Sequence, residues 1–253
     1  MHLGRSVEYA ASVAVSKKRA ASNQSNSKAR RSGAAVEFDS DEAVRKLVQS
    51  DERLARLIER VGPFRLRLRT IHNPFNALAR AIIYQQLSGK AAEAIHGRVV
   101  SSLRTGRILA PQDVLNATEE MLRGAGLSRA KAAALKDLAA KAIDGVVPTL
   151  RQLRRMDDEE IIRRLSGIRG IGRWTVEMLL IFRLGRPDVL PVDDYAIRKG
   201  FALTYETGEL PSPKELTQYA ERWRPYRTVA SWYLWSALDL PRWRETDNRK
   251  NRW

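Results

Sequence analysis

The sequence predicts an all-α protein of two helical lobes with a cleft between them. Three observations carry this prediction. Apolar residues recur at close to the helical period in one segment after another beyond residue 38. Most of these segments begin at a capping residue or a proline and end at a glycine. A single stretch, residues 64–69, alternates as a strand would, and one isolated strand cannot build a sheet.

The first half of the chain supplies about five of the roughly ten helices expected. Each has a start signal, an apolar face or a stop signal of its own. We expect a helix from Asp39, capped by Asp41, to Gly62; one from Pro74 after the Asn73 cap; one after Ser88; a short one from Pro111; and one from the Ser128 cap to Gly145.

The second half continues the pattern around a glycine hairpin. We expect a helix capped by Asp157 or Asp158 and ending at Leu165, an apolar and therefore central helix over 173–184, one beginning at Tyr195, one capped by Ser212, and an aromatic helix over 226–238.

Composition favours a polyanionic partner. The 253 residues carry 45 Lys and Arg against 29 Asp and Glu, a net charge of +16. Such an excess points to nucleic acid more than to an acidic membrane surface. No window approaches the roughly eighteen apolar residues of a membrane helix, so we expect no membrane partner.

Several classes of chemistry are excluded. The chain has no cysteine, which removes disulfides, thiolate zinc sites, iron–sulfur clusters and cysteine nucleophiles. Its three histidines are scattered and form neither a metal cluster nor a triad. We expect an intracellular protein, in a bacterial nucleoid or, in a eukaryote, a nucleus.

Residues 1–35 read as a disordered basic tail, followed by one domain of two helical subdomains over 36–253. The tail holds seven basic residues and one acid, so +10 of the net charge remains in the body. An acid-poor leader of this composition is also compatible with an organelle transit peptide.

The segment Gly170-Ile171-Gly172 joins two expected helices and is the first candidate site. Glycines at a helix N-terminus allow bare backbone N–H groups to approach a phosphate closely. The alternative is a tight turn with no ligand. Apolar Leu165, Ile168 and Ile171 around the glycines, and the basic charge of the chain, favour a DNA-binding helix-hairpin-helix motif.

Two adjacent carboxylates follow one helix later. Asp193 and Asp194 precede the helix expected at Tyr195, and either can cap it. We assign the cap to Asp193 and keep Asp194 for chemistry, since a helix N-terminus stabilises a negative charge.

Aromatic side chains and two glutamines complete the candidates. Trp174, Trp235, Met178 and Tyr233 are either core residues or walls of a pocket that binds a planar, electron-poor base by stacking. Gln85 and Gln86 end a helix. They are either solvated there or enter a duplex where a base has been extruded.

Several separate motifs, in order, closely resemble the helix-hairpin-helix DNA glycosylases of the 3-methyladenine DNA glycosylase II type. The resemblance covers about residues 38–240. It is carried by the hairpin over 165–175 with Asp194, by Tyr84-Gln85-Gln86-Leu87-Ser88, by Gly126-Leu127-Ser128 with Lys131, and by Trp223-Arg224-Pro225-Tyr226-Arg227.

The resemblance implies base excision: a monofunctional enzyme, acting as a monomer, flips an alkylated purine out of double-stranded DNA and cuts its N-glycosidic bond. It implies no required cofactor. The roles it implies are a catalytic Asp194; a base pocket of Trp174, Trp235, Met178, Ala196 and Gln85; a DNA wedge at Gln86; DNA-backbone contacts at Gly170, Gly172 and Thr175; and a Na⁺ or K⁺ ion on the backbone carbonyls of Ser166, Ile168 and Ile171.

One position sets the reaction type, and four others depart from the family pattern. Bifunctional relatives carry a catalytic lysine where this chain has Trp174, so the resemblance implies no Schiff base and no lyase step. Arg169 and Val176 replace a usual proline and alanine, and Met178 and Ala196 imply a more open pocket. A mismatch or oxidised-base glycosylase, and a non-catalytic DNA-binding module, remain as alternatives.

Overall fold

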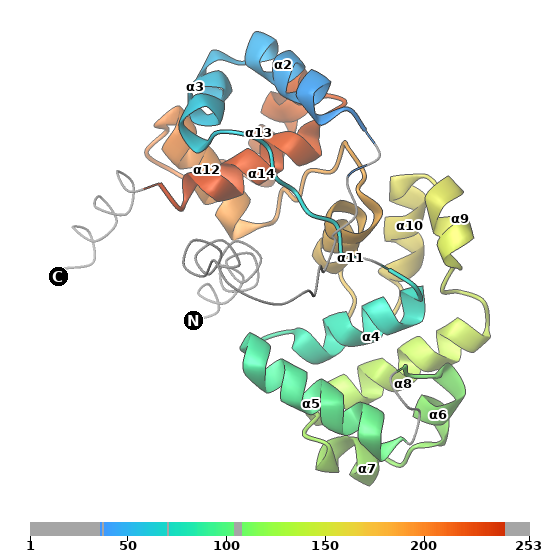
Figure 1. Cartoon of the computed structure of the whole chain (residues 1–253). Helices are drawn as coiled ribbons and strands as arrows, with labels where there is room; N and C mark the ends of the chain where they lie inside the picture. Colours follow the sequence, from blue (N-terminus) through green and yellow to red (C-terminus); the bar gives the residue numbers. More distant parts are fainter. Residues whose placement is uncertain (1–35, 37, 70, 104–107, 241–253) are drawn as a thin grey trace, which may run out of the picture. The chain divides into compact units, whose positions relative to one another are not determined.

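Helices form almost all the regular structure of this computed structural model, which describes residues 36, 38–69, 71–103 and 108–240. The predicted tail over 1–35 lies outside the described residues. The chain divides into two compact units (Figure 1): the first holds the described residues up to Arg69 together with those from Leu180 onward, and the second runs from residue 70 to Leu179. In the described part of the chain, no helix is long and apolar enough to cross a membrane.

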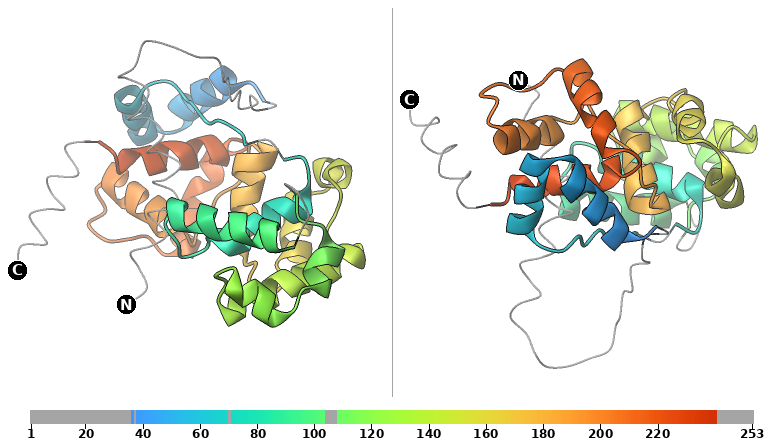
Figure 2. Two further views of the ribbon diagram at one scale, coloured as in Figure 1. Left: turned by 60° about the horizontal axis from the view of Figure 1, so that its bottom comes forward. Right: turned by 90° about the horizontal axis from the view of Figure 1, so that it is seen from above.

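The first unit is assembled from both ends of the chain. Helices α2 and α3 pack against α14 from the other end, as Figures 1 and 2 show for the blue and red segments. The elements of this unit are α2 (Ser40–Ser50), α3 (Glu52–Val61), the π-helical segment η2 (Leu180–Leu184), α12 (Tyr195–Tyr205), α13 (Pro213–Tyr219), the 3₁₀ segment η3 (Ala220–Trp223) and α14 (Arg227–Ala237).

A buried carboxylate organises the aromatic core of this unit. Asp51 is 5% exposed, and its Oδ2 accepts hydrogen bonds from the Tyr205 hydroxyl at 2.7 Å and from Trp223 Nε1 at 2.9 Å. Its Oδ1 caps α3 by accepting from the Leu54 N–H. Burial and the Asp51 charge raise the pKa of Tyr205 far above its usual range, so the phenol stays a donor. Three hydrogen-bond donors therefore compensate for the loss of water around this carboxylate, as a buried charge requires.

Helices α12 and α14 approach each other unusually closely. A Cβ atom placed on Gly200 of α12 would lie 2.1 Å from the backbone oxygen of Leu234 in α14. Because that neighbour is backbone rather than a flexible side chain, only glycine fits at this crossing. The crossing matters for the site because α12 and α14 both carry candidate site residues.

The second unit is a continuous run of helices in which α8 packs against α4 and α6. Its apolar core includes Leu78, Ile82, Leu135, Leu138 and Ile161. The elements are α4 (Pro74–Tyr84), α5 (Gly89–Ser102), α6 (Pro111–Asn116), α7 (Glu119–Gly124), α8 (Arg129–Ile143), α9 (Leu150–Arg155), α10 (Asp158–Leu165) and α11 (Arg173–Leu179).

The all-α prediction is confirmed, but several boundaries differ from expectation. The first expected helix is two helices, because Asp51 leaves the helical conformation to end α2 and cap α3, and its cap is Asp39 rather than Asp41. The central helix expected over 173–184 turns π-helical from Leu180. Helix α9 was not expected, although Thr149 and Gln152 form a capping box before it.

The alternating stretch 64–69 is an extended connection, as expected. Leu66 and Leu68 are buried while the intervening arginines are exposed. The backbone N–H of Arg69 donates to the Phe182 carbonyl oxygen at 2.9 Å. Leu68 packs on Gly185, where a Cβ would come within 2.8 Å of its side chain. The connection therefore covers η2 within the first unit.

We expect Gly200→Ala to lower the free energy of unfolding by about 1–3 kcal/mol, because the added methyl group must push α12 off α14. Urea unfolding followed by circular dichroism measures this. Gly97→Ala is the control: Gly97 lies inside α5 with open space around it, so that change leaves stability equal or raises it by up to about 1 kcal/mol. Equal stability of the two variants contradicts the close crossing.

Candidate active site

The hairpin between α10 and α11 is a tight turn whose shape depends on one glycine. The Ile171 N–H donates to the Ile168 carbonyl at 3.0 Å, and Gly170 adopts a φ of 78°. A positive φ at this turn position favours glycine. Gly170 and Gly172 are exposed while Ile168 and Ile171 are buried. The exposed backbone at the start of α11 is thus the arrangement that the sequence predicts for holding a phosphate.

Thr175 is placed differently from the two glycines. Its side chain is buried, and its N–H donates to the Gly172 carbonyl at 3.0 Å inside the first turn of α11. It therefore contributes to the helix start rather than to the exposed face of the hairpin. Because the Thr175 N–H is already bonded, it is not free to donate to the DNA backbone, the contact that the resemblance implies for this residue.

The hairpin is rich in oxygen atoms, which is the donor set that a monovalent cation prefers. The Ile168 carbonyl oxygen accepts one hydrogen bond, from the Ile171 N–H. Because a carbonyl oxygen has two lone pairs, its second lone pair can bind a cation. Among the described side chains, the Ser166 hydroxyl oxygen is buried with no hydrogen-bond partner. Ser166, Ile168 and Ile171 also line one concave surface of the hairpin. These residues fit the cation that the family resemblance implies there.

Gln85 and Gln86 form a second tight turn, at the end of α4. The Leu87 N–H donates to the Tyr84 carbonyl, and Gln86 has a φ of 58°. That conformation is strained for a residue other than glycine, and such strain gathers at functional sites. Gln86 is exposed, as a residue that enters a duplex must be.

Gln85 links this turn to the hairpin. Its Nε2 donates to the Gly170 carbonyl at 2.8 Å. The structure therefore brings the predicted wedge and the predicted phosphate site together within the second unit. It gives the Gln85 side chain a partner that the sequence did not indicate, and its assignment to the base pocket remains a prediction.

Asp194 caps α12, and the assignment of that cap to Asp193 is wrong. The Asp194 Oδ1 accepts from the Ile197 N–H at 3.0 Å, whereas Asp193 is exposed one residue too early to do so. Asp194 is only 2% exposed. Its carboxylate thus lies at the positive end of a helix dipole, where a negative charge is stabilised.

The same carboxylate contacts an aromatic residue of α14. Trp235 Nε1 lies 3.3 Å from the Asp194 Oδ1, and Phe182 stacks on the Trp235 ring with centroids 5.6 Å apart. Ala196, in the first turn of α12, is buried. Asp194, Trp235 and Phe182 are therefore one cluster within the first unit. The sequence did not single out Phe182, whose only signal is its position in the apolar run of η2.

The segment that leads to Asp194 is fastened to the start of α14. Arg227 makes a two-pronged ion pair with Asp188, with nitrogen–oxygen distances of 2.7 and 2.9 Å. The Thr228 hydroxyl donates to the Arg186 carbonyl and accepts from the Val189 N–H. These contacts join the two elements that form the cluster, because α14 carries Trp235 and the segment after η2 leads to Asp194.

The other pocket candidates lie on α11 of the second unit. Met178 is buried, and Trp174 is partly exposed in the first turn of α11, directly after the hairpin. Tyr233 of the first unit is fully buried and donates to the Gly62 carbonyl. Tyr233 is thus a core residue, the ordinary alternative for an aromatic side chain.

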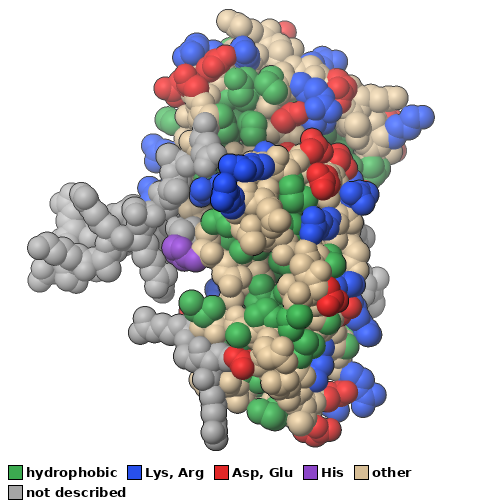
Figure 3. All heavy atoms as spheres, turned by 90° about the vertical axis from the view of Figure 1, so that its right-hand side faces the viewer, with side chains coloured by type: hydrophobic (Ala, Val, Ile, Leu, Met, Phe, Trp, Pro, Cys, Tyr) green, Lys and Arg blue, Asp and Glu red, His purple; other side chains and the backbone are tan. Residues whose placement is uncertain are grey.

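Three basic residues within the motifs of the resemblance are already engaged. Arg173 pairs with Glu159 and Glu177, and Arg227 pairs with Asp188. The Lys131 ammonium group donates to two backbone carbonyls. On the face that Figure 3 shows, many Lys and Arg side chains likewise lie beside Asp and Glu. For these three residues the structure favours an internal role.

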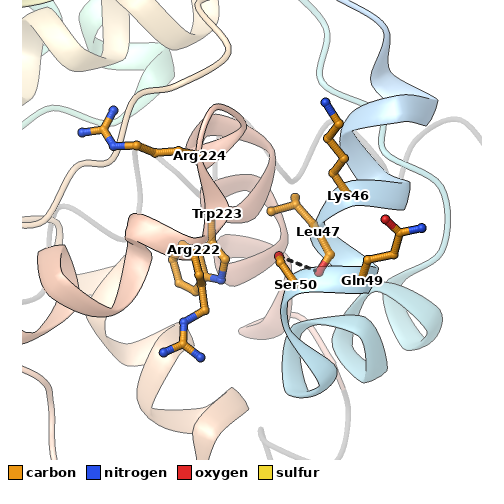
Figure 4. Close-up of a pocket in the computed structure, with 7 residues that line it drawn as sticks. All are labelled: Lys46, Leu47, Gln49, Ser50, Arg222, Trp223 and Arg224. Carbon is orange, nitrogen blue, oxygen red and sulfur yellow. Dashed lines mark hydrogen bonds between the residues drawn. The ribbon is translucent and has the colours of Figure 1, made fainter.

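A concave surface elsewhere in the first unit gathers three basic residues but no binding geometry. Lys46, Arg222 and Arg224 line it, and Figure 4 shows their charged ends pointing in different directions. Lys46 pairs with Glu42, and Arg224 pairs with Asp188 and Glu221. We assign no ligand to it.

We expect Asp194→Ala to lower the free energy of unfolding by about 1–2 kcal/mol, because the cap of α12 is lost. Asp194→Asn keeps an oxygen that accepts from the Ile197 N–H, so its stability should stay close to that of the wild type. Thermal unfolding of both variants measures the difference. An alanine variant as stable as the asparagine variant argues against the cap.

Sequence comparisons with known proteins identify the family. Residues 79–225 match the model of the HhH-GPD superfamily base excision DNA repair proteins. The chain is 40% identical to DNA-3-methyladenine glycosylase 1 of Schizosaccharomyces pombe, over 75% of this chain and 84% of that protein. It is 31% identical to the alkylbase DNA glycosidase-like protein mag2 of the same organism, over 81% and 97%.

Solved structures give the same result. The S. pombe 3-methyladenine DNA glycosylase Mag1, in complex with abasic DNA, matches with a TM-score of 0.69 and 39% identity, covering 79% of this chain and 98% of that one. A DNA-3-methyladenine glycosidase from Bacillus halodurans matches with a TM-score of 0.71 and 37% identity, covering 79% and 91%. The chain belongs to the HhH-GPD superfamily of base excision DNA repair proteins.

Proposed function

We propose that Asp194 is the catalytic carboxylate of a monofunctional DNA glycosylase, which hydrolyses the N-glycosidic bond of alkylated purines in double-stranded DNA. The observation that carries this proposal is a buried carboxylate, held at a helix N-terminus beside Trp235. The named relatives support the substrate class, since they are 3-methyladenine DNA glycosylases. The protein is a base excision repair enzyme of that type.

The chemistry follows from the charge on the leaving group. A purine alkylated at N3 or N7 is cationic, so the C1′–N bond breaks with its electron pair passing to the base and without a strong general acid. The deoxyribose becomes oxocarbenium-like as the bond breaks. The Asp194 carboxylate stabilises that positive charge and orients the water that adds to C1′. The products are a free base and an abasic site.

The remaining elements bind and open the duplex. Gln86 enters the space left by the extruded base, and the hairpin backbone at Gly170 and Gly172 contacts a phosphate. We assign contacts with the base to Trp174, Trp235, Met178 and Ala196, since an aromatic face attracts a cationic purine. A Na⁺ or K⁺ ion on the hairpin carbonyls would reinforce the phosphate contact. The enzyme acts as a monomer.

The absence of a suitably placed amine sets the reaction type. Trp174 occupies the position, two residues after Gly172, where bifunctional relatives carry their catalytic lysine. Without an amine at that position no Schiff base forms with the sugar, and the strand is not cut. Hydrolysis at C1′ is then the complete reaction.

We expect Asp194→Asn to slow single-turnover release of 3-methyladenine from methylated DNA by about a hundredfold or more, because the amide carries no charge to stabilise the sugar. Affinity for an abasic-analogue duplex should stay within about threefold of wild type, since the fold and the cap are kept. Chromatography of the freed bases and fluorescence anisotropy give the two values. Release at the wild-type rate by this variant would falsify the assignment of Asp194.

We also expect borohydride to trap no covalent complex between the protein and alkylated DNA, because Trp174 offers no amine. The abasic strand should remain intact until alkali is added. A denaturing gel with and without borohydride checks this. A trapped band that shifts to the mass of the protein plus DNA would show lyase chemistry and contradict the monofunctional mechanism.

A further inference from the structure

Helix α8 presents one stripe of side chains to the two turns of the second unit to which the proposed function assigns DNA contacts. Lys131, Ala134, Asp137 and Lys141 follow one another at steps of three or four residues, so they lie along one face of the helix. Each of them contacts either the Gln85–Gln86 turn or the hairpin. Nothing in the sequence resemblance assigned a role to Asp137 or Lys141.

Lys131 holds the end of α4. Its Nζ donates to the carbonyl oxygens of Ile83 at 2.7 Å and Gln85 at 2.6 Å. These carbonyls come at the C-terminus of α4, where a positive charge is favourable and where helical partners are missing. Gln86 follows at once in its strained conformation. The ammonium group thus fixes the backbone on which the predicted wedge is carried.

Asp137 and Lys141 hold the hairpin in the same manner. The Asp137 Oδ2 accepts from the Arg169 N–H at 2.7 Å and from Lys141 Nζ at 2.7 Å. Lys141 Nζ also donates to the Gly167 carbonyl at 2.6 Å. Burial opposes the charge on Asp137, but these two donors outweigh it and lower the pKa of that carboxyl. The pair therefore binds one donor and one acceptor of the hairpin backbone.

Two further contacts close the arrangement. Ala134, between the two anchors, lies so close to Gly170 that a Cβ there would be 3.0 Å from the alanine methyl group. Gln85 joins the wedge turn directly to the Gly170 carbonyl. The turn, the hairpin and α8 thus form a closed loop of contacts inside one unit.

We propose that α8 sets the register between the wedge turn and the hairpin, with Lys131 and the Asp137–Lys141 pair as its positioning residues. A base leaves the stack only if the wedge enters the duplex at a fixed distance from the phosphate that the hairpin holds. An α-helix is stiff, so fixing both turns to one helix fixes that distance. This proposal rests on the proposed function for its catalytic readout, but not for its binding readout.

The test compares Lys131→Met with Lys136→Met. Lys136 is a matched control because it lies on the same helix, is similarly part-buried, and donates to a carbonyl of another helix, that of Leu115 at 3.2 Å. That carbonyl belongs to α6 and not to either turn. Two duplexes are used, one with an alkylated purine in a full pair and one with it unpaired.

We expect Lys131→Met to slow single-turnover release from the paired duplex about tenfold more than from the unpaired one, because an unpaired base needs less help to leave the stack. Lys136→Met should match the wild type on both duplexes. Lys131→Arg keeps the donors and should restore most of the rate. Equal slowing on the two duplexes, or none, overturns the role of Lys131, and so does an equal effect of Lys136→Met.

At the other anchor, Asp137→Asn and Lys141→Met should each weaken binding of an abasic-analogue duplex about tenfold. The rate of release at saturating protein should change little. Affinities equal to wild type overturn this half of the proposal. Glu52→Gln is the control, since it removes only an exposed ion pair between Glu52 and Arg56. An equal loss of affinity in this control also overturns this half of the proposal.

The wild-type protein shows whether a negative result contradicts the proposed function or only the register proposal. If it binds the abasic-analogue duplex but releases no base from either lesion duplex, the proposed function fails and the register proposal is decided by the affinities alone. If it releases bases and the α8 variants match it in both rate and affinity, only the register proposal fails. Urea unfolding of each variant supplies the folded fraction, and an unfolded Lys131→Met is replaced by Lys131→Gln.

Discussion

The proposed active site depends on the carboxylate of Asp194, which is held almost fully buried at the N-terminus of α12. A buried negative charge is costly unless donors surround it. The Ile197 N–H and the Trp235 indole N–H donate to this carboxylate. The positive end of the α12 dipole stabilises its charge further. A carboxylate stabilised in this way is aligned before any substrate arrives, so it needs no rearrangement when positive charge develops on a sugar.

This constraint explains features far from Asp194 in the sequence. Gly200 lets α12 and α14 approach closely enough for Trp235 to reach the carboxylate. The Arg227–Asp188 pair ties the segment before Asp194 to the start of the same α14. Asp51 holds Tyr205 at the end of α12. Each contact stabilises the fold, and together they fix one oxygen atom.

In the second unit, too, polar groups that must be held in place receive hydrogen-bond partners from a distant part of the chain. A tight turn that must present backbone or a strained side chain to a ligand cannot bury its own polar groups, so it needs partners from elsewhere. Here α8 provides them, through ammonium groups on carbonyls and a carboxylate on an N–H. In the proposed function, the exposed parts of the two turns contact DNA.

Much of this was predictable from the sequence, for reasons that are local. Helix caps and glycine turns act over a few residues, which is why α4, α8, α13 and the hairpin were expected where they lie. The family resemblance singled out Asp194 and Trp235. The cap was assigned to Asp193 rather than Asp194 because the sequence pattern does not fix the first residue of the helix to within one position.

Other features could not be predicted because they depend on contacts between distant residues. Lys131 and Arg227 look like surface charges in the sequence, and only the packing of α8 and α14 shows what they bind. Phe182 carries no motif, and its stacking on Trp235 joins residues 53 positions apart. The break of the first helix at Asp51 follows from its bonds to Tyr205 and Trp223, which come much later in the chain.

The most direct test of the central claim compares excision of charged and neutral bases by the wild-type protein. Duplexes carrying 7-methylguanine or 3-methyladenine, 8-oxoguanine, or a mismatch would be incubated with excess protein and the freed bases quantified. A site with a fixed carboxylate and no strong general acid should release the cationic alkylpurines and leave the neutral bases in place. Release of 8-oxoguanine or a mismatched base faster than the alkylpurines would contradict the account.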